Sequence, residues 1–196
     1  DLWLTHSSVH ADLLVGRYHL PRAQVQVLPY HADPAYFDPD LVDRDTASRP
    51  TPRPYLLAVG RQHRDYPTLL SAVEGLPVDV VIDAGSLYSR SPDLLTGRHL
   101  PETVHLVSLD TAQLRDAYAL AEVVVAPTLE NDFGAGGTTL LEGMSMARPV
   151  VTTRSMGNGD VVADPTQALA LGKIRSTGFE PAPVVDQLDA YLRALP

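Results

Sequence analysis

The sequence predicts an α/β fold, a doubly wound parallel sheet of the Rossmann type. From position 54 onward, short apolar runs that suit strands buried on both faces alternate with segments of helical period. Gly60 and Gly85 end the first two runs, and a glycine-rich stretch, 134–137, follows the fourth. Strands that alternate with helices in this way pair in parallel through crossover connections. Ligands of such sheets bind beyond the carboxyl ends of the strands.

The first part of the chain predicts a shorter α/β segment. We expect a strand at 2–4, a helix that begins at Ser7 or Ser8, and a strand at 25–28 that Pro29 ends. The helix carries apolar side chains at helical spacing, namely Val9, Leu13, Leu14 and Tyr18.

Composition changes divide the chain into four parts. Because the sequence opens inside an apolar strand, we interpret 1–37 as the remnant of a preceding domain. The stretch 38–53 is rich in Asp, Arg, Thr and Pro and is predicted to be a linker. The main Rossmann-like domain is placed at 54–180, and a last helix at 181–196.

Five strands and several helices are expected in the main domain. The strands are predicted within 54–60, 78–85, 102–109, 122–127 and 148–153. The helices are predicted over 65–76, over 111–121, behind the glycine-rich stretch, from 164, and over 184–195. Asp65 suits the cap of the first helix. Four loops at the strand ends deserve inspection as ligand contacts: Gly60–Arg61, Gly85–Ser86, Pro127–Glu130 and Gly157–Asp160.

The stretch Gly134–Val151 predicts an anion site. A turn glycine lets the backbone approach a ligand, and the helix behind it presents unpaired N–H groups. Leu140, Met144 and Ala147 are predicted to face the core, with Glu142 on the opposite side. The dinucleotide pattern G-x-G-x-x-G/A fails at Thr139, and no Gly-Lys-Ser/Thr of the Walker pattern follows.

Composition limits the functions that remain. The net charge of −9 argues against a nucleic-acid partner. No apolar run approaches the length of a membrane span, and the absence of cysteine excludes thiolate metal sites. His6 and His10, four apart, could pair on a metal, but no third ligand lies near them in the sequence. The histidines at 31, 63, 99 and 105 show no ligand spacing, so we expect no metal and no cofactor.

Four motifs occur together: VGRQHRDYPTLL, VVIDAGS, LRDAYALAEVVVAPTLE and GTTLLEGMSMARPVVTT. In order and spacing they resemble the glycosyltransferase family 4 type with a GT-B fold, over roughly Pro54 to Val162. The stretch from Thr5 to Pro39 looks like the family's passage from the acceptor domain into the linker. In this fold two Rossmann domains face each other, and the C-terminal one binds the sugar nucleotide. The resemblance also implies that no metal is needed.

The resemblance implies a role for each matching residue. Glu142 matches the second glutamate of the family's Glu-seven residues-Glu motif, which binds the ribose. The amides of Gly137 and Thr138 match those that meet the diphosphate. Arg61 and Arg64 match the cations that neutralise the leaving group, which gives them a catalytic role. Without the resemblance, Arg61 suits a structural role equally well. The implied donor-binding set is Gly60, Arg61, Arg64, Ser86, Gly136, Gly137, Thr138, Thr139 and Glu142.

The sequence departs from the family pattern at two sites. Gly134 stands where the motif has its first glutamate, and Gly136 stands where the family usually has phenylalanine. Glu130 would reach the first position only if its loop folded back. The segment after Asp160 also matches the family poorly.

We therefore expect a cytoplasmic glycosyltransferase, of the retaining kind, that uses a nucleoside diphosphate-sugar. This stretch supplies the donor-binding half and is expected to be inactive alone. The acceptor, which is a sugar, a lipid or a small molecule, would meet the other domain, as would a membrane surface. Two alternatives stay open: a non-catalytic nucleotide-sugar-binding or scaffold module, and a sugar-nucleotide epimerase of the same fold.

Overall fold

The computed structural model describes residues 1–85, 95 and 99–162. Three predictions from the sequence, namely Ser86 as a donor ligand, a helix from 164 and a last helix over 184–195, lie outside these residues.

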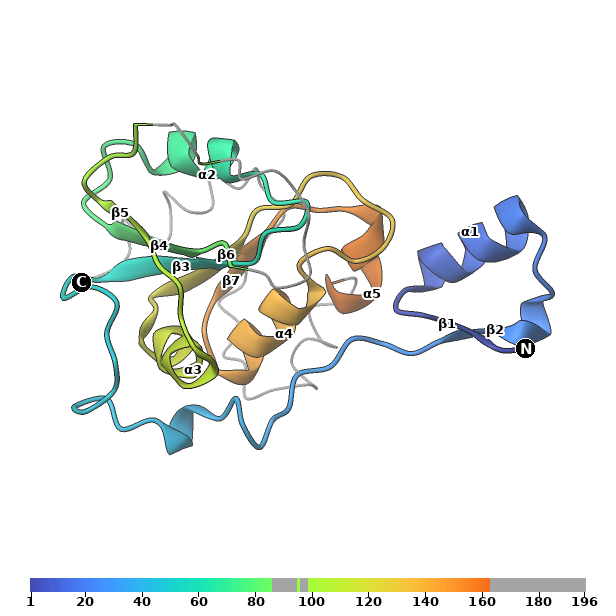
Figure 1. The fold of residues 1–196 in the computed structure, drawn as a ribbon, viewed down its shortest axis with the longest axis horizontal. Helices are drawn as coiled ribbons and strands as arrows, with labels where there is room; N and C mark the ends of the chain where they lie inside the picture. The colour runs from blue at the N-terminus through green and yellow to red at the C-terminus, as the bar shows by residue number, and fades with distance from the viewer. Residues whose placement is uncertain (86–94, 96–98, 163–196) are drawn as a thin grey trace.

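The chain begins with a small parallel βαβ unit. Strands β1 (Trp3–Thr5) and β2 (Val25–Val27) pair in parallel, and helix α1 (Ser8–Tyr18) connects them. Ser7 caps α1, because its side chain accepts a hydrogen bond from the amide of His10. A short turn, η1 (Arg22–Gln24), precedes β2. In Figure 1 this unit lies beside the main domain, next to its last described helix. The order strand, helix, strand confirms the prediction for this segment.

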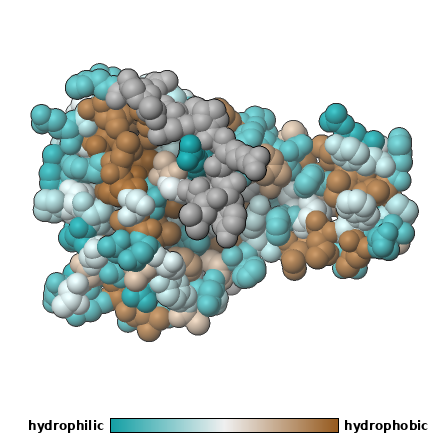
Figure 2. Space-filling view, viewed as in Figure 1, coloured by the Kyte–Doolittle hydropathy of each residue, from teal (hydrophilic) through white to brown (hydrophobic). Residues whose placement is uncertain are grey.

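The βαβ unit leaves several apolar side chains exposed. Leu2, Trp3, Leu4 and Leu28 are each about half exposed or more, at 48–59%. Figure 2 shows the resulting hydrophobic surface on this unit. In α1 only Ala11 is fully buried, and Tyr18 at its end is exposed.

The predicted linker packs along the main domain. It contains one turn of 3₁₀ helix, η2 (Pro39–Leu41). Arg44 Nη2 donates to the carbonyl of Ala119, and the amide of Ser48 donates to Asp116 Oδ2, both at 3.0 Å. Val42 is buried in the same cluster as residues of the adjacent helix α3 (Thr111–Leu120). The segment is therefore held by hydrogen bonds and a buried contact, while the domain boundaries proposed above stay a prediction.

The main domain is built on a five-stranded parallel sheet in the order β5-β4-β3-β6-β7. Every neighbouring pair is parallel, with β3 in the centre and Leu56 in register with both Val80 and Val123. The order reverses between β3 and β6, as the doubly wound prediction requires. The strands are β3 (Tyr55–Val59), β4 (Asp79–Asp83), β5 (Val104–Leu106), β6 (Val123–Ala126) and β7 (Val150–Thr152).

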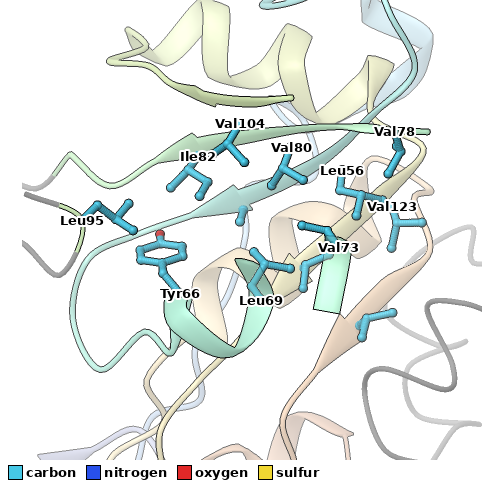
Figure 3. Packing of buried hydrophobic residues seen from close by; sticks show 13 residues of the cluster. Leu56, Tyr66, Leu69, Val73, Val78, Val80, Ile82, Leu95, Val104 and Val123 are labelled. Carbon is cyan, nitrogen blue, oxygen red and sulfur yellow. The ribbon is translucent and has the colours of Figure 1, made fainter. Parts of the chain in front are cut away.

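Helices cover both faces of this sheet (Figure 1). Helix α2 (Tyr66–Val73) packs on one face, where Tyr66 and Leu69 meet Val80 and Ile82 of β4 (Figure 3). Helices α3 (Thr111–Leu120) and α4 (Gly137–Ser145) cover the other face. A 3₁₀ turn, η3 (Met156–Asn158), and a short helix, α5 (Gly159–Val162), follow β7.

Helix α4 is shorter than predicted. Leu140 and Met144 are buried as expected, but the helix ends at Ser145. Ala147 does not belong to its core-facing stripe, because its backbone is left-handed, with φ of 53°. The amide of Arg148 then donates back to the carbonyl of Gly143, which closes the helix end. This ending turns the chain directly into β7.

Candidate functional site

The glycine-rich turn lies at the carboxyl end of the sheet and leads into α4. Gly134 and Gly136 have φ of 78° and 91°, a backbone conformation that a side chain would strain. The amide of Gly137 donates to the carbonyl of Gly134, which closes the turn. The amide of Thr138 has no acceptor among the described residues. Thr138 is exposed, so this N–H group is available to an anion.

Two asparagines hold this turn from either side. The amide of Ala135 donates to Asn131 Oδ1 at 2.9 Å, and Asn158 Nδ2 donates to the carbonyl of Ala135 at 2.8 Å. Both asparagines are buried. The turn is consequently fixed by side chains that precede and follow it, before any ligand binds.

A pocket of about 240 Å³ opens in front of the turn. It is lined by segments that follow β2, β3, β4 and β6. Such a position, at the carboxyl ends of parallel strands, is the one predicted from the sequence. The lining residues are Tyr30, Gly60, Arg61, Gln62, Arg64, Gly85, Phe133, Gly134, Ala135, Gly136, Gly137 and Thr138.

Arg64 forms a buried part of the pocket wall, with 4% of its surface exposed. Its guanidinium donates to the carbonyls of Val59 and Gln62, each at 2.9 Å, and to Thr139 Oγ1 at 3.1 Å. No carboxylate of the described residues lies within ion-pair distance of it. Burial lowers the pKa of Arg64. A buried cation with only neutral partners favours an anion in the pocket beside it.

The loop that carries Arg61 and Arg64 is tied to the loop after β6. The amide of Asp65 donates to the carbonyl of Pro127, and the amide of Leu129 donates to the carbonyl of His63. Arg61 itself is half-buried and lines the pocket. Six of the predicted donor ligands thus come together around one cavity: Gly60, Arg61, Arg64, Gly136, Gly137 and Thr138.

Thr139 and Glu142 are not among the residues that line the pocket. Thr139 accepts the hydrogen bond from Arg64, while Tyr118 of α3 donates to Glu142 Oε2 at 2.8 Å. Burial raises the pKa of Glu142, although the hydrogen bond from Tyr118 opposes this. The role of Glu142 as ribose ligand stays a prediction.

Glu130 is exposed and is bonded to the segment that follows β7. Its Oε1 accepts a hydrogen bond from the amide of Met156 at 2.9 Å. In the fourth predicted loop, Asp160 accepts two hydrogen bonds from the amide and hydroxyl of Ser8, at 2.5 and 2.6 Å. The segment after β7 therefore joins the main domain to the βαβ unit.

Sequence reasoning missed the two aromatic rings of the pocket, Tyr30 and Phe133. Tyr30 follows β2 and lies more than one hundred positions before the turn that it contacts, so no local spacing connects them. Phe133 directly precedes the glycine-rich turn, and this position in the sequence was the one signal that could have placed its ring in the pocket.

Among the residues that the structure describes, no three histidine, aspartate or glutamate side chains gather to hold a metal. The absence of a metal requirement stays a prediction. None of the described helices has the length and apolar character to cross a bilayer.

Comparison with known proteins supports the fold and the family. The family model described as glycosyl transferases group 1 matches residues 53–179, more than half of the chain. A glycosyltransferase from Rickettsia africae has a similar structure, with a TM-score of 0.73 and 17% identity over 98% of this chain and 53% of that one. AviGT4, a glycosyltransferase involved in avilamycin A biosynthesis, gives 0.59 and 19% over 98% and 54%. This chain thus spans about half the length of these structures. Comparison with curated protein sequences gives no match.

Proposed function

This chain belongs to the glycosyl transferases group 1 family, and we propose that it supplies the donor-binding half of a glycosyltransferase that uses a nucleoside diphosphate-sugar. The observation that carries this proposal is the pairing of Arg64, buried with no carboxylate partner among the described residues, with the amide of Thr138 at the start of α4. Both features face one pocket and both favour a bound anion.

The pocket is sized for only part of a sugar nucleotide. Its volume of about 240 Å³ is below the roughly 300–1,000 Å³ of pockets that enclose a whole drug-sized ligand. We place the diphosphate at Thr138 and Arg64, with the sugar as the neighbouring group inside the pocket. The nucleoside then extends along α4.

The position of Glu142 sets the direction in which we expect the nucleoside to lie. It lies five residues into α4, about 7.5 Å along the helix axis from Gly137. Tyr118 donates a hydrogen bond to Glu142 Oε2, and Glu142 Oε1 has no hydrogen-bond partner among the described residues. Oε1 is the acceptor that we assign to a ribose hydroxyl.

In the proposed reaction the bond between the sugar and the diphosphate breaks, and an acceptor hydroxyl forms the new glycosidic bond with retained configuration. The proton of the acceptor hydroxyl passes to solvent, and the diphosphate leaves with the electron pair of the broken bond and therefore with an added negative charge. Arg61 and Arg64 stabilise that charge, because they already face the pocket. Acceptor binding belongs to the half of the fold that this chain does not contain.

The test is a thermal-shift screen of the chain with UDP, dTDP, GDP and ADP, because a ligand of the native state raises the unfolding temperature. We expect one of them to stabilise the chain, and no sugar transfer by the chain alone. Transfer activity in the isolated chain would contradict the assignment to one half of the enzyme. A stabilising diphosphate without transfer in any complete enzyme would instead favour a non-catalytic binding module.

A further inference from the structure

Tyr118 of α3 makes the one side-chain hydrogen bond that is recorded for Glu142 within the described part of the chain. Its hydroxyl donates to Glu142 Oε2 at 2.8 Å. Glu142 Oε1 has no hydrogen-bond partner among the described residues, and it is not one of their buried polar atoms that lack a partner. Oε1 therefore reaches solvent. The carboxylate thus has one oxygen that the protein holds and one that a ligand can meet.

The hydroxyl of Tyr118 is fixed by the packing around it. The side chain is fully buried, and its ring meets Phe37 edge to face, with centroids 5.9 Å apart. The helix that carries it is bonded to the central strand, because the hydroxyl of Tyr55 in β3 donates to the carbonyl of Ala117 at 2.7 Å. A donor that is locked in this way holds the group it bonds within a narrow range of orientations. The orientation of the Glu142 carboxylate is therefore set by α3.

Tyr118 also lies close to the cationic side of the site. Thr139 and Glu142 are three residues apart in α4, so their side chains share one face of the helix. Thr139 accepts the hydrogen bond from Arg64. Burial and the charge of Glu142 raise the pKa of Tyr118, while the positive charge of Arg64 opposes this rise. The hydroxyl consequently stays protonated and donates, between the side chain assigned to the diphosphate and the one assigned to the ribose.

The same hydrogen bond favours the ionised form of Glu142. Burial raises the pKa of Glu142, and the hydrogen bond from Tyr118 opposes this rise. An ionised carboxylate accepts stronger hydrogen bonds from hydroxyl groups than a neutral carboxyl does. Among the described residues, Tyr118 is the titratable side chain that acts on the pKa of Glu142, and Arg64 is a charged group that acts on Tyr118. Loss of the hydroxyl should therefore leave Glu142 protonated over a wider range of pH.

We propose that Tyr118 is a positioning residue for donor binding, which holds Oε2 of Glu142 so that Oε1 faces a ribose hydroxyl of the nucleoside diphosphate. This inference rests on the proposed function, because that function assigns the ribose to Glu142 Oε1. Ribose recognition then depends on a hydroxyl that is not part of the pocket lining and touches no part of the ligand.

The test is titration calorimetry of the chain with UDP, dTDP, GDP and ADP, and with the 2′,3′-dideoxy form of each one that binds. For the natural chain we expect loss of the ribose hydroxyls to weaken binding at least about tenfold, the scale of a hydrogen bond to a charged group. Tyr118→Phe removes the hydroxyl that holds Glu142 and keeps the ring. It should reduce this ratio to about threefold or less, as for a weaker, neutral hydrogen bond. Its affinity for the dideoxy form should stay within about twofold of the natural value, because the two changes are then independent.

The pH dependence of the ratio separates positioning from packing. In the natural chain the ratio should fall as the pH decreases through the folded pKa of Glu142, because the neutral carboxyl is the poorer acceptor. In Tyr118→Phe the midpoint of this fall should move to higher pH, since the hydrogen bond that opposed the effect of burial is gone. Tyr55→Phe is the matched control. It removes the hydroxyl of another buried tyrosine that bonds to α3, and it should keep both the ratio and the midpoint.

A second background tests whether Tyr118 acts through Glu142. In Glu142→Ala the ratio should already be lost, and the addition of Tyr118→Phe should leave it unchanged. A further fall of the ratio in the double variant would overturn this inference. A natural ratio and midpoint in Tyr118→Phe, or an equal loss of affinity for both forms of the ligand, would overturn it too.

Failure of this inference is distinguishable from failure of the proposed function. Equal affinities for the two forms in the natural chain would overturn the role of Tyr118 and leave diphosphate binding standing. Failure of all four nucleoside diphosphates to bind would overturn the proposed function and this inference with it.

Discussion

Arg64 Nη2 donates a hydrogen bond to Thr139 Oγ1 at 3.1 Å, and this contact joins the loop after β3 to the first turn of α4. Thr139 Oγ1 also approaches the carbonyl of Val59 at 3.3 Å. The cation of the pocket is thereby fixed to the helix whose first residues, Gly137 and Thr138, line the same cavity. Arg64 therefore both packs the site and supplies its positive charge.

Substitution of Arg64 should separate these two roles. Arg64→Met removes three hydrogen bonds of a buried guanidinium, to the carbonyls of Val59 and Gln62 and to Thr139 Oγ1. We expect a loss of about 1–3 kcal/mol in the free energy of unfolding, since hydrogen bonds to a charged group contribute on this scale, together with a loss of diphosphate affinity. Arg64→Lys keeps the charge but not the forked geometry. It should lose stability and keep most of the affinity. Urea unfolding and calorimetry measure the two effects, and equal affinity losses in both variants would contradict the role of the charge.

Glu142 is expected to bind the ribose at a cost in stability. Its folded pKa is raised above the ordinary value of 4.5, so its stabilising contribution is present below that value and is lost as the pH rises through the folded pKa. Glu142→Gln can still accept the hydrogen bond from Tyr118 without a buried charge. It should unfold at the same temperature as the natural chain at pH 4 and at a higher temperature at pH 8. A lower unfolding temperature at pH 8 would contradict this account.

Nucleotide binding should respond to the loss of Glu142 in the opposite sense to stability. Glu142→Ala removes the acceptor and should weaken nucleoside diphosphate binding by about 1.5–3 kcal/mol, as for a hydrogen bond to a charged group. Titration calorimetry at pH 7.5 measures this difference. An unchanged affinity would show that the ribose is held elsewhere.

Asp79 at the start of β4 should make folding sensitive to acid. Burial opposes its ionisation, but hydrogen bonds from Thr51 and His105 and the charge of Arg53 outweigh this and hold its pKa below the usual 3.8. The stability it supplies is therefore present above pH 3.8 and is lost as the pH falls through the lower, folded pKa. Asp79→Asn should lower the free energy of unfolding by about 1–3 kcal/mol at pH 7. The difference should shrink below pH 3, and a constant difference across this range would count against the charge.

Two helix glycines should respond to alanine with opposite signs. A Cβ at Gly143 of α4 would lie 3.1 Å from three atoms of Val124, a fully buried residue of the central sheet. Gly143→Ala should therefore destabilise the chain, by about 1 kcal/mol after the gain in helix propensity. A Cβ at Gly16 of α1 would meet nothing within 4 Å, so Gly16→Ala should stabilise by about 0.5–1 kcal/mol. Thermal unfolding of both variants provides the comparison, and stabilisation by Gly143→Ala would contradict the close packing of α4 on β6.

The fold could be predicted from the sequence because its signals are local. Apolar runs such as 78–83 and caps such as Asp65 determine strand and helix positions within a few residues. The sequence pattern placed the end of α4 too late in the chain. Ala147 adopts a left-handed backbone there, and an alanine gives no sequence signal for that conformation. Arg61 and Arg64 of the pocket were predicted from the family resemblance of the motif VGRQHRDYPTLL. Tyr30 could not be, since its place over Gly137 depends on how the βαβ unit meets the main domain.

The central claim, that the pocket binds a nucleoside diphosphate, is tested most directly by titration calorimetry of the chain with UDP, dTDP, GDP and ADP at millimolar concentrations. The account predicts saturable binding of at least one of these compounds, weakened at least about tenfold in Arg64→Met, which corresponds to 1.4 kcal/mol. Absence of binding by all four would contradict it.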